Sequence, residues 1–455
     1  MKKTLREQKA ITLVALIITI IVLLVLAIVS INLVINSGII SKAQYAVDKY
    51  SDEEVGEQIK LSYLEYKSES LHNGNVDYRN YMETSLGKVY GDENVEVSQM
   101  GRNLKIEING CTKIYTIRYD GSVKEKEKVE PMTATSVYGK LDNGTLYLKA
   151  TEDDNYILYT SSRVIQSDWK NVLKIKIEEP IAPTTCFEMF RGFENCTEIE
   201  GIEKLHTENS TSGNCMFCSC KSLTSIDVTR FETSKMNNIS AMFYDCQGLL
   251  NIDISGFDTG KVTTFYETFT NCKSLKELDI SNFNTSNSYN MMEMFMSCSS
   301  LENIDVSGFD TSNVYTFGYM FKGCSSLKNL NVKNFNTEKA SNMDSMFYGC
   351  SSLTSLDVSR FNTNSVTNMG SMFINLQNLE SLNLSNFNTG NVTNMQWMFC
   401  DCKKLKKLDI SNFTINHNKC EYIVDKVPSD IKIKATQDTA NKIIANSNLT
   451  SSNFE

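Results

Sequence analysis

Residues 294–319 read MFMSCSSLENIDVSGFDTSNVYTFGY, and residues 320–345 read MFKGCSSLKNLNVKNFNTEKASNMDS. The second segment repeats the first at a period of 26 residues, and this period holds over eight units without an insertion or a deletion. Its most regular marker is a phenylalanine, found at Phe231, Phe257, Phe283, Phe309, Phe335, Phe361, Phe387 and Phe413. A fixed period of this length is typical of a solenoid, in which each unit is one coil and buries its apolar face only against its neighbours.

Each unit is predicted to place a short strand on one wall of the coil and a helical or 3₁₀ turn on the opposite wall. Ile304 and Val306 should point into the core while Asp305 faces solvent, as the two-residue period of a strand requires. Adjacent coils would add these strands in parallel. On the other wall, apolar positions such as Met369 and Phe373 recur every three or four residues, which favours a helical turn.

A cysteine precedes the regular leucine of each unit by three residues, except in the unit where Leu376 takes its place. We interpret these cysteines as buried, reduced thiols, because the Cβ atoms of stacked coils are about 4.8 Å apart, farther than a disulfide usually allows. The positions are Cys220, Cys246, Cys272, Cys298, Cys324, Cys350 and Cys402. Cys215-x-x-Cys218-x-Cys220 and Cys400-x-Cys402 have spacings seen in metal sites, but no second module completes four ligands. We therefore predict no metal and no cofactor.

One outward position of the predicted strand is acidic in six of the eight units. The residues are Asp227, Asp253, Asp279, Asp305, Asp357 and Asp409, with Asn331 and Asn383 in the other two units. Two interpretations are open. The carboxylates could accept hydrogen bonds from neighbouring serine hydroxyls or backbone amides, or they could bind calcium, which requires six to eight oxygen ligands.

The N-terminal residues predict a membrane anchor. Residues 1–10 form a basic leader, and residues 11–36 form a transmembrane helix whose first 19 residues carry no charge. Because positive residues stay on the cytoplasmic side, we expect a single-pass protein of the cell membrane with a cytoplasmic N-terminus and extracellular repeats at the cell surface.

The rest of the chain divides into five segments of a predicted α+β fold. Residues 37–121 should form a helix and a small antiparallel sheet, with a hairpin turn at Asn109-Gly110. Residues 122–131 are charged and end in Pro131, which predicts a linker. Residues 132–208 should cap the first open edge and contain a degenerate first repeat, residues 209–413 are the regular repeats, and residues 414–455 form a C-terminal cap.

The sequence around Ala10 resembles the type IV prepilin signal, in which a peptidase cuts ahead of a long apolar helix. The resemblance implies processing between Ala10 and Ile11, and a pilin-like character for residues 37–121. Ala10 stands where that family usually has Gly, and Ala15 stands where pilins carry Glu.

The repeat pattern MF-x-x-C-x-S-L-x-x-L-D-V-S-x-FDTS-x-V resembles the BspA-like family of leucine-rich-repeat bacterial surface proteins, and similar repeats occur in mycoplasma surface lipoproteins. The resemblance covers residues 132–455 and implies adhesion or protein recognition outside the cell, with no catalytic residues. We expect two kinds of partner, the membrane through the N-terminal helix and an unknown extracellular protein or glycan. An alternative is a minor pilin or pseudopilin that displays the solenoid.

Composition excludes other classes of function. The net charge of −9 gives no electrostatic footprint for nucleic acid. The chain has only three histidines and no nucleophile elbow, zinc-protease or P-loop motif, so we predict that it is not an enzyme. Ligand-binding residues would lie at variable exposed positions, so the repeat pattern leaves them unknown.

Overall fold

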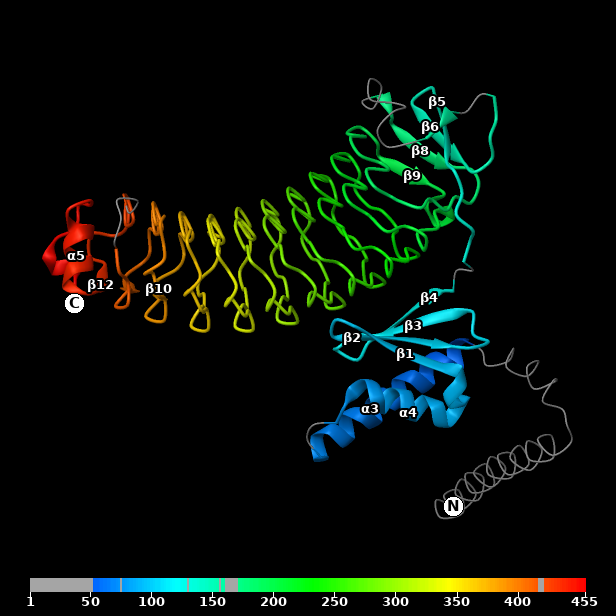
Figure 1. Cartoon of the computed structure of the whole chain (residues 1–455), viewed down its shortest axis with the longest axis horizontal. Helices are drawn as coiled ribbons and strands as arrows, with labels where there is room; N and C mark the ends of the chain where they lie inside the picture. Colours follow the sequence, from blue (N-terminus) through cyan, green and yellow to red (C-terminus); the bar gives the residue numbers. More distant parts are fainter. Residues whose placement is uncertain (1–51, 74–75, 129–130, 155–156, 160–170, 416–420) are drawn as a thin grey trace, which may run out of the picture. The chain divides into compact units, whose positions relative to one another are not determined.

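The structure is a computed structural model that describes residues 52–73, 76–128, 131–154, 157–159, 171–415 and 421–455. The expected leader, the expected transmembrane helix at 11–36 and the processing residues Ala10 and Ile11 lie outside these ranges. Within them, no helix is long and apolar enough to cross a membrane. The chain forms two compact units (Figure 1). The first consists of the residues up to Glu96 together with Glu107–Ile114, and the second consists of Val97–Ile106 together with Tyr115–Glu455.

Among the described residues of the first unit there are two helices, where we expected one within 37–121. Helix α3 spans Asp52–Asn73 and helix α4 spans Tyr78–Tyr90, followed by the 3₁₀ turn η2 at Asp92–Asn94. Asp77 begins α4 because its side chain accepts a hydrogen bond of 3.0 Å from the amide of Asn80. The two helices also share a hydrogen bond of 3.0 Å from Ser85 to Ser62.

A four-stranded sheet follows, in the order β1-β2-β3-β4, and the boundary between the units runs through its strands. The strands are β1 (Val95–Met100), β2 (Asn103–Ile108), β3 (Lys113–Ile117) and β4 (Val123–Glu127). The hairpin expected at Asn109-Gly110 joins β2 to β3. The structure corrects the prediction of a linker at 122–131, because Val123–Glu127 form the edge strand β4. Two of its lysines, Lys124 and Lys126, pair with acidic residues far away in the sequence.

The sheet of the N-terminal cap begins with an antiparallel hairpin and continues with strands that pair in parallel, as the coils of the solenoid do. Strands β5 (Tyr138–Asp142) and β6 (Thr145–Lys149) pair antiparallel around Asn143-Gly144, while β6 pairs in parallel with β8 (Lys174–Ile177), and β8 with β9 (Glu198–Glu200). Strand β7 (Ile157–Leu158) adds to β5, and the 3₁₀ turn η4 (Ile202–Lys204) follows β9.

The strand wall of the repeats is less regular than predicted. Among the described residues of 209–413, only β10 (Ser381–Asn383) and β11 (Lys407–Asp409) are strands, and β11 pairs in parallel with β12 (Lys432–Lys434) of the C-terminal cap. Elsewhere coils meet through isolated parallel bridges such as Asn303↔Asn329. The predicted alternation holds, because Ile304 and Val306 are buried and Asp305 is exposed.

The opposite wall, called the turn wall below, is a run of overlapping turns and not a helix. In one coil the amides of Met294, Met296 and Cys298 each bond to the carbonyl three residues earlier, at 3.1 to 3.3 Å. The intervening amides donate to the next coil, as Phe295 does to Met320 at 2.9 Å. Glu293 and Ser297 have φ of 60°, the left-handed conformation that type II turns require. Helix and overlapping turns share a spacing of three to four residues, so the apolar pattern could not distinguish them.

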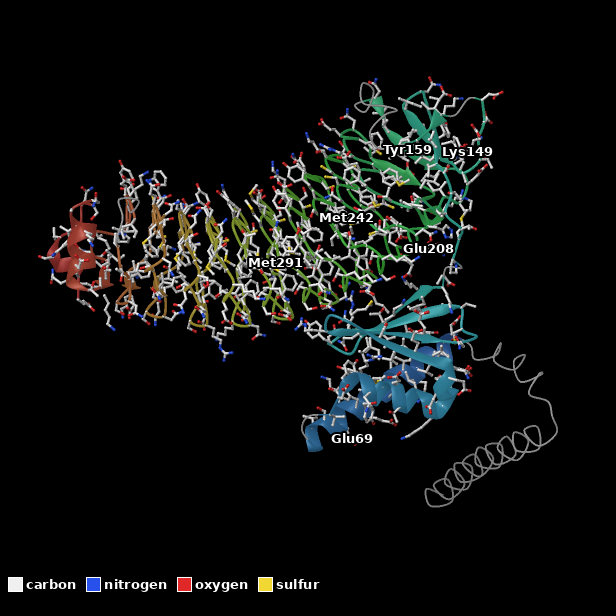
Figure 2. The ribbon with its side chains drawn as sticks, viewed as in Figure 1. Glu69, Lys149, Tyr159, Glu208, Met242 and Met291 are labelled. Carbon is white, nitrogen blue, oxygen red and sulfur yellow. The ribbon has the colours of Figure 1, made fainter. Side chains whose placement is uncertain are left out.

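Phenylalanine and methionine fill the core behind this wall (Figure 2, where Met242 and Met291 are labelled). Rings stack coil upon coil with centroids 5.6 to 6.1 Å apart and planes within 14° of parallel. This stack comprises Phe217, Phe243, Phe269, Phe295, Phe321, Phe347, Phe373 and Phe399. Helix α5 (Gln437–Ile444) and the 3₁₀ turn η5 (Ser451–Asn453) complete the C-terminal cap, and Thr439 of α5 bonds to the carbonyl of Phe413.

Candidate functional site

The six aspartates of the strand wall, called the acidic column below, use one carboxylate oxygen within their own coil. Oδ1 of Asp305 accepts hydrogen bonds from the amide and the hydroxyl of Ser307, at 2.9 and 2.6 Å. Oδ1 of Asp253 accepts the same pair from Ser255, at 3.1 and 2.6 Å. The hydrogen-bonding interpretation of the column is therefore the one that the structure supports.

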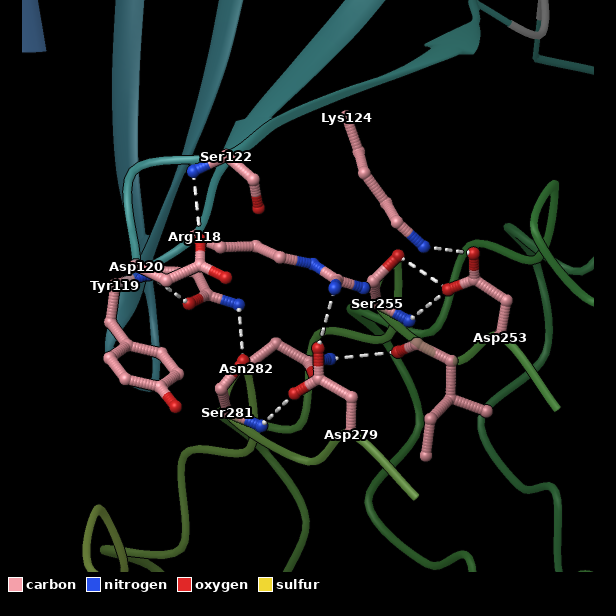
Figure 3. A network of polar contacts seen from close by, with 12 residues as sticks. Arg118, Tyr119, Asp120, Ser122, Lys124, Asp253, Ser255, Asp279, Ser281 and Asn282 are labelled. Carbon is pink, nitrogen blue, oxygen red and sulfur yellow. Dashed lines mark hydrogen bonds and ion pairs between the residues drawn. The ribbon is translucent and has the colours of Figure 1, made fainter. Parts of the chain in front are cut away.

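The second oxygen of three of these aspartates pairs with a cation from the preceding sheet, and Figure 3 shows two of the pairs, Arg118 with Asp279 and Lys124 with Asp253. Arg102 Nη2 lies 2.6 Å from Asp305 Oδ2, and Arg118 Nη1 lies 2.9 Å from Asp279 Oδ2. Lys124 of β4 pairs with Asp253. Lys126 of β4 continues the series to Glu232, at 2.6 Å. Four successive coils thus each pair one acidic side chain with one cation from the sheet or its turns.

Two glycines permit the close approach at this contact, Gly101 to the backbone of the solenoid and Gly308 to the Arg102 side chain. Gly101 has φ of 55°, and a Cβ atom there would lie 2.6 Å from the carbonyl carbon of Asn282. A Cβ atom on Gly308 would lie 2.8 Å from Nε of Arg102. The amide of Arg102 then reaches the carbonyl of Ser281 at 2.9 Å, and the buried Asn103 side chain donates to the Ser281 hydroxyl at 3.0 Å.

Farther along the column the cations come from the solenoid and its cap. Lys333 lies 3.0 Å from Asp357, and Lys434 lies 3.4 Å from Asp409. Hydrogen bonds from Ser359, with Lys333 beside it, lower the pKa of Asp357 to about 2. A calcium ion would have to displace these donors and cations before it could collect six to eight oxygens. The carboxylates of the column therefore form ion pairs within the chain, with the preceding sheet, with the solenoid and with its C-terminal cap.

The ladder cysteines are buried and unpaired, as interpreted from the sequence. Each thiol donates a hydrogen bond to a phenylalanine carbonyl of the preceding coil, as Cys298 does to Phe269 at 3.0 Å. Burial raises the pKa of the Cys298 thiol to about 12. In the part of the chain that the structure describes, no group of three or more His, Cys, Asp or Glu side chains could hold a metal ion. Cys220 belongs to the ladder and donates to Phe190 at 3.1 Å, so it points away from Cys215.

Aromatic rings on the turn wall, two of them exposed and four partly exposed, are a second surface feature, which sequence reasoning missed. We call it the aromatic stripe. Its members are Tyr244, Tyr266, Tyr319, Tyr348, Trp397 and Tyr422. Trp397 and Tyr422 are 42% and 53% exposed, and their rings lie parallel with centroids 6.0 Å apart. Lys322 places its ammonium 4.9 Å from the Tyr319 ring and 5.1 Å from the Tyr348 ring. These positions vary between coils, so the repeat consensus hides them.

Carboxylate side chains lie beside several rings of the stripe, such as Asp344 beside Tyr319 and Glu267 beside Tyr266. A hydrogen bond to Asp344, with partial burial, raises the pKa of Tyr319 to about 12. Partial burial and the nearby Glu267 raise the pKa of Glu293. The stripe thus combines flat apolar rings with hydrogen-bond acceptors, which is the composition of a recognition surface.

The repeats match the sequence family described as "Mycoplasma protein of unknown function, DUF285" over residues 184–299, 248–356 and 350–426, more than half of the chain. The chain belongs to this family. No curated protein matches it. Two solved structures are similar at low identity. A leucine-rich repeat protein from Bacteroides ovatus ATCC 8483 is 15% identical, over 68% of this chain and 100% of that one, with a TM-score of 0.21.

The second structure is a leucine-rich repeat protein from Eubacterium ventriosum ATCC 27560. It is also 15% identical, over 66% of this chain and 94% of that one, with a TM-score of 0.28. TM-scores of this size carry no argument about function. The DUF285 match begins inside the N-terminal cap and ends just after the last repeat, so both walls of the solenoid lie within the family's own region.

Proposed function

We propose that this DUF285 protein is a membrane-anchored bacterial surface protein whose solenoid mediates adhesion or protein recognition, with the aromatic stripe as the binding surface. The BspA-like character of the repeats supports a role in attachment. The apolar residues 11–36 support an anchor, with the repeats outside the cell. The partner is an extracellular protein or glycan, because both present apolar faces and hydroxyl or amide groups to rings and carboxylates.

The exposed ring pair of Trp397 and Tyr422 is the observation that carries this proposal. Large rings on a folded surface cost hydration free energy, and Trp and Tyr are the residues that most often dominate the free energy of binding at interfaces. The strand wall offers less, because the acidic column is engaged by Arg102, Arg118, Lys124 and by lysines of the solenoid. The turn wall is therefore the better candidate for an external partner.

The test displays the full chain on cells and measures their attachment to arrays of immobilised matrix proteins and glycans. Trp397→Ala combined with Tyr422→Ala should lower the affinity for any bound ligand by about 30-fold or more, as loss of a hot spot does. The matched control is Tyr289→Ala with Tyr315→Ala, because these tyrosines are 48% and 52% exposed but precede the turn wall in their coils. Equal losses in both double variants would contradict the assignment to the stripe.

A minor pilin or pseudopilin is the second candidate function. The prepilin-like residues around Ala10 and the succession of helix and small sheet favour it. Intact-mass analysis of the protein from its own membrane distinguishes the two, because processing would produce a mature N-terminus at Ile11. A full-length N-terminus would leave the permanent anchor as the explanation.

A further inference from the structure

Two cysteines outside the buried ladder face each other across one turn of the turn wall. Cys215 and Cys218 are the first and fourth residues of this turn, and the amide of Cys218 donates to the carbonyl of Cys215 at 3.1 Å. Cys215 is partly exposed and Cys218 is 6% exposed, whereas the ladder cysteines are exposed by 1% or less. The ends of such a turn lie within about 7 Å, a Cα separation that overlaps the range of disulfides.

The fold does not require cysteine at either position. The same two positions in the seven later coils hold unrelated pairs, in contrast to the ladder position. These pairs are Ala241 and Tyr244, Glu267 and Thr270, Glu293 and Met296, Tyr319 and Lys322, Ser345 and Tyr348, Ser371 and Ile374, and Trp397 and Cys400. Packing therefore accepts small, polar, charged and aromatic side chains here, and the pair of thiols needs another explanation.

The preceding coil places an ion pair against the two thiols. Backbone hydrogen bonds run from Glu188 to Asn214 at 2.9 Å and from Gly192 to Cys218 at 2.7 Å, which brings Glu188 and Arg191 alongside the turn. Arg191 and Glu188 also pair with each other. On the other side lie Tyr244 and Asp245 of the next coil. A cation beside a thiol stabilises the thiolate, which is the reactive form.

The pair is chemically distinct from the ladder. A hydrogen bond from the Cys215 thiol, with smaller contributions from Ser219 and Arg191 against the opposing effect of burial, lowers the pKa of the Cys218 thiol, while the same hydrogen bond raises that of Cys215. Cys218 therefore forms the reactive thiolate more readily than the ladder thiols, whose pKa burial raises. Cys220, the third cysteine of the motif, is turned to the core and bonded to Phe190. Among the residues that the structure describes, no third His, Cys, Asp or Glu side chain joins Cys215 and Cys218 in a group that could hold a metal ion.

We propose that Cys215 and Cys218 form a thiol–disulfide exchange site that takes low-molecular-weight disulfides as its substrate. The thiolate attacks one sulfur of the small disulfide, forms a mixed disulfide and expels one small thiolate. The second cysteine loses its proton, attacks the protein sulfur of the mixed disulfide and expels the other small thiolate. The protein dithiol is oxidised to an internal disulfide, and one small disulfide is reduced to two small thiols.

The experiment uses the full chain in detergent, reduced and then exposed to glutathione disulfide under non-denaturing conditions. Free thiols are alkylated after denaturation, and the peptides are identified by mass spectrometry. We expect two of the 14 cysteines to be protected, with a single disulfide between Cys215 and Cys218 and a mass lower by about 2 Da. Rates measured against pH should rise with the ionisation of Cys218, at a lower pH than the ladder thiols require.

Substitutions already present in other coils supply variants that keep the fold. Cys215→Ala copies Ala241, and Cys218→Thr copies Thr270. Each should abolish the internal disulfide, and Cys215→Ala should instead accumulate a mixed disulfide at Cys218. Cys400→Ser removes the other cysteine that is partly exposed among the described residues, and it should change nothing. Failure of Cys215 and Cys218 to react ahead of the ladder, or a disulfide that survives in Cys215→Ala through Cys220, would overturn the proposal.

Discussion

Thr337 illustrates what a fixed position of the repeat does at the scale of one residue. Its side chain is 1% exposed, its hydroxyl donates to the carbonyl of Asn362 at 2.9 Å, and it accepts from the amide of Asn362 at 2.8 Å. Thr311 and Thr363 make the same pair of bonds to the coils that follow them. The amide that each of these threonines satisfies belongs to the next coil.

Thr337→Val should therefore lower the free energy of unfolding by about 1 to 3 kcal/mol, because it keeps the shape of the buried side chain and leaves the partly buried amide of Asn362 without its acceptor. Thr337→Ser retains the hydroxyl and should recover most of the loss. The control is Thr367→Val, since Thr367 is exposed and its loss should cost about 0.5 kcal/mol or less. Urea denaturation measures all three, and equal losses at Thr337 and Thr367 would contradict the role given to the buried hydroxyl.

At the scale of one element, strand β4 shows why part of the fold escapes sequence analysis. Its residues Val123–Glu127 are mostly charged, so they resemble a solvated linker. The groups that neutralise Lys124 and Lys126 are Asp253 and Glu232, more than 100 residues later. No local pattern contains that information. The same limit applies to the turn wall, where the acceptors of every second amide lie in the next coil.

The contact between this sheet and the acidic column should weaken in acid. At Asp253 and Asp305 burial acts to raise the pKa, but hydrogen bonds from Ser255 or Ser307 and the cation of Lys124 or Arg102 outweigh it, so both pKa values are lowered. A lowered pKa contributes stability that is fully present above the unfolded value of about 3.9 and is lost as pH falls through the folded value.

We therefore expect hydrogen-exchange protection of β4, corrected for the intrinsic effect of pH, to stay constant from pH 7 to about pH 4 and to fall below it. Asp305→Asn should reduce this acid sensitivity, because one titrating partner is gone. Protection that rises as pH falls below about 4 would mean that the carboxylates are not what holds the sheet.

At the scale of the whole molecule, the repeating positions were predictable and the varying positions were not. The period, the buried Phe and Cys positions and the alternation around Asp305 follow from the sequence, because each is repeated in nearly every coil. The cations that pair with the acidic column and the exposed rings of Trp397 and Tyr422 are not repeated from coil to coil. Their contacts depend on which distant segments meet, and a repeat consensus contains no information about residues that differ between coils.

The acidic column pairs with the chain's own basic sheet, which leaves the turn wall as the surface that we propose for external recognition. A charge exchange at Arg118 and Asp279, which are 2.9 Å apart, tests this pairing most directly. Hydrogen exchange on the full chain should show lost protection in β3, β4 and residues 279–283 for Arg118→Asp and for Asp279→Arg. The double variant should restore protection in all three segments. Single variants that exchange like the natural protein, or a double variant worse than either, would contradict the account.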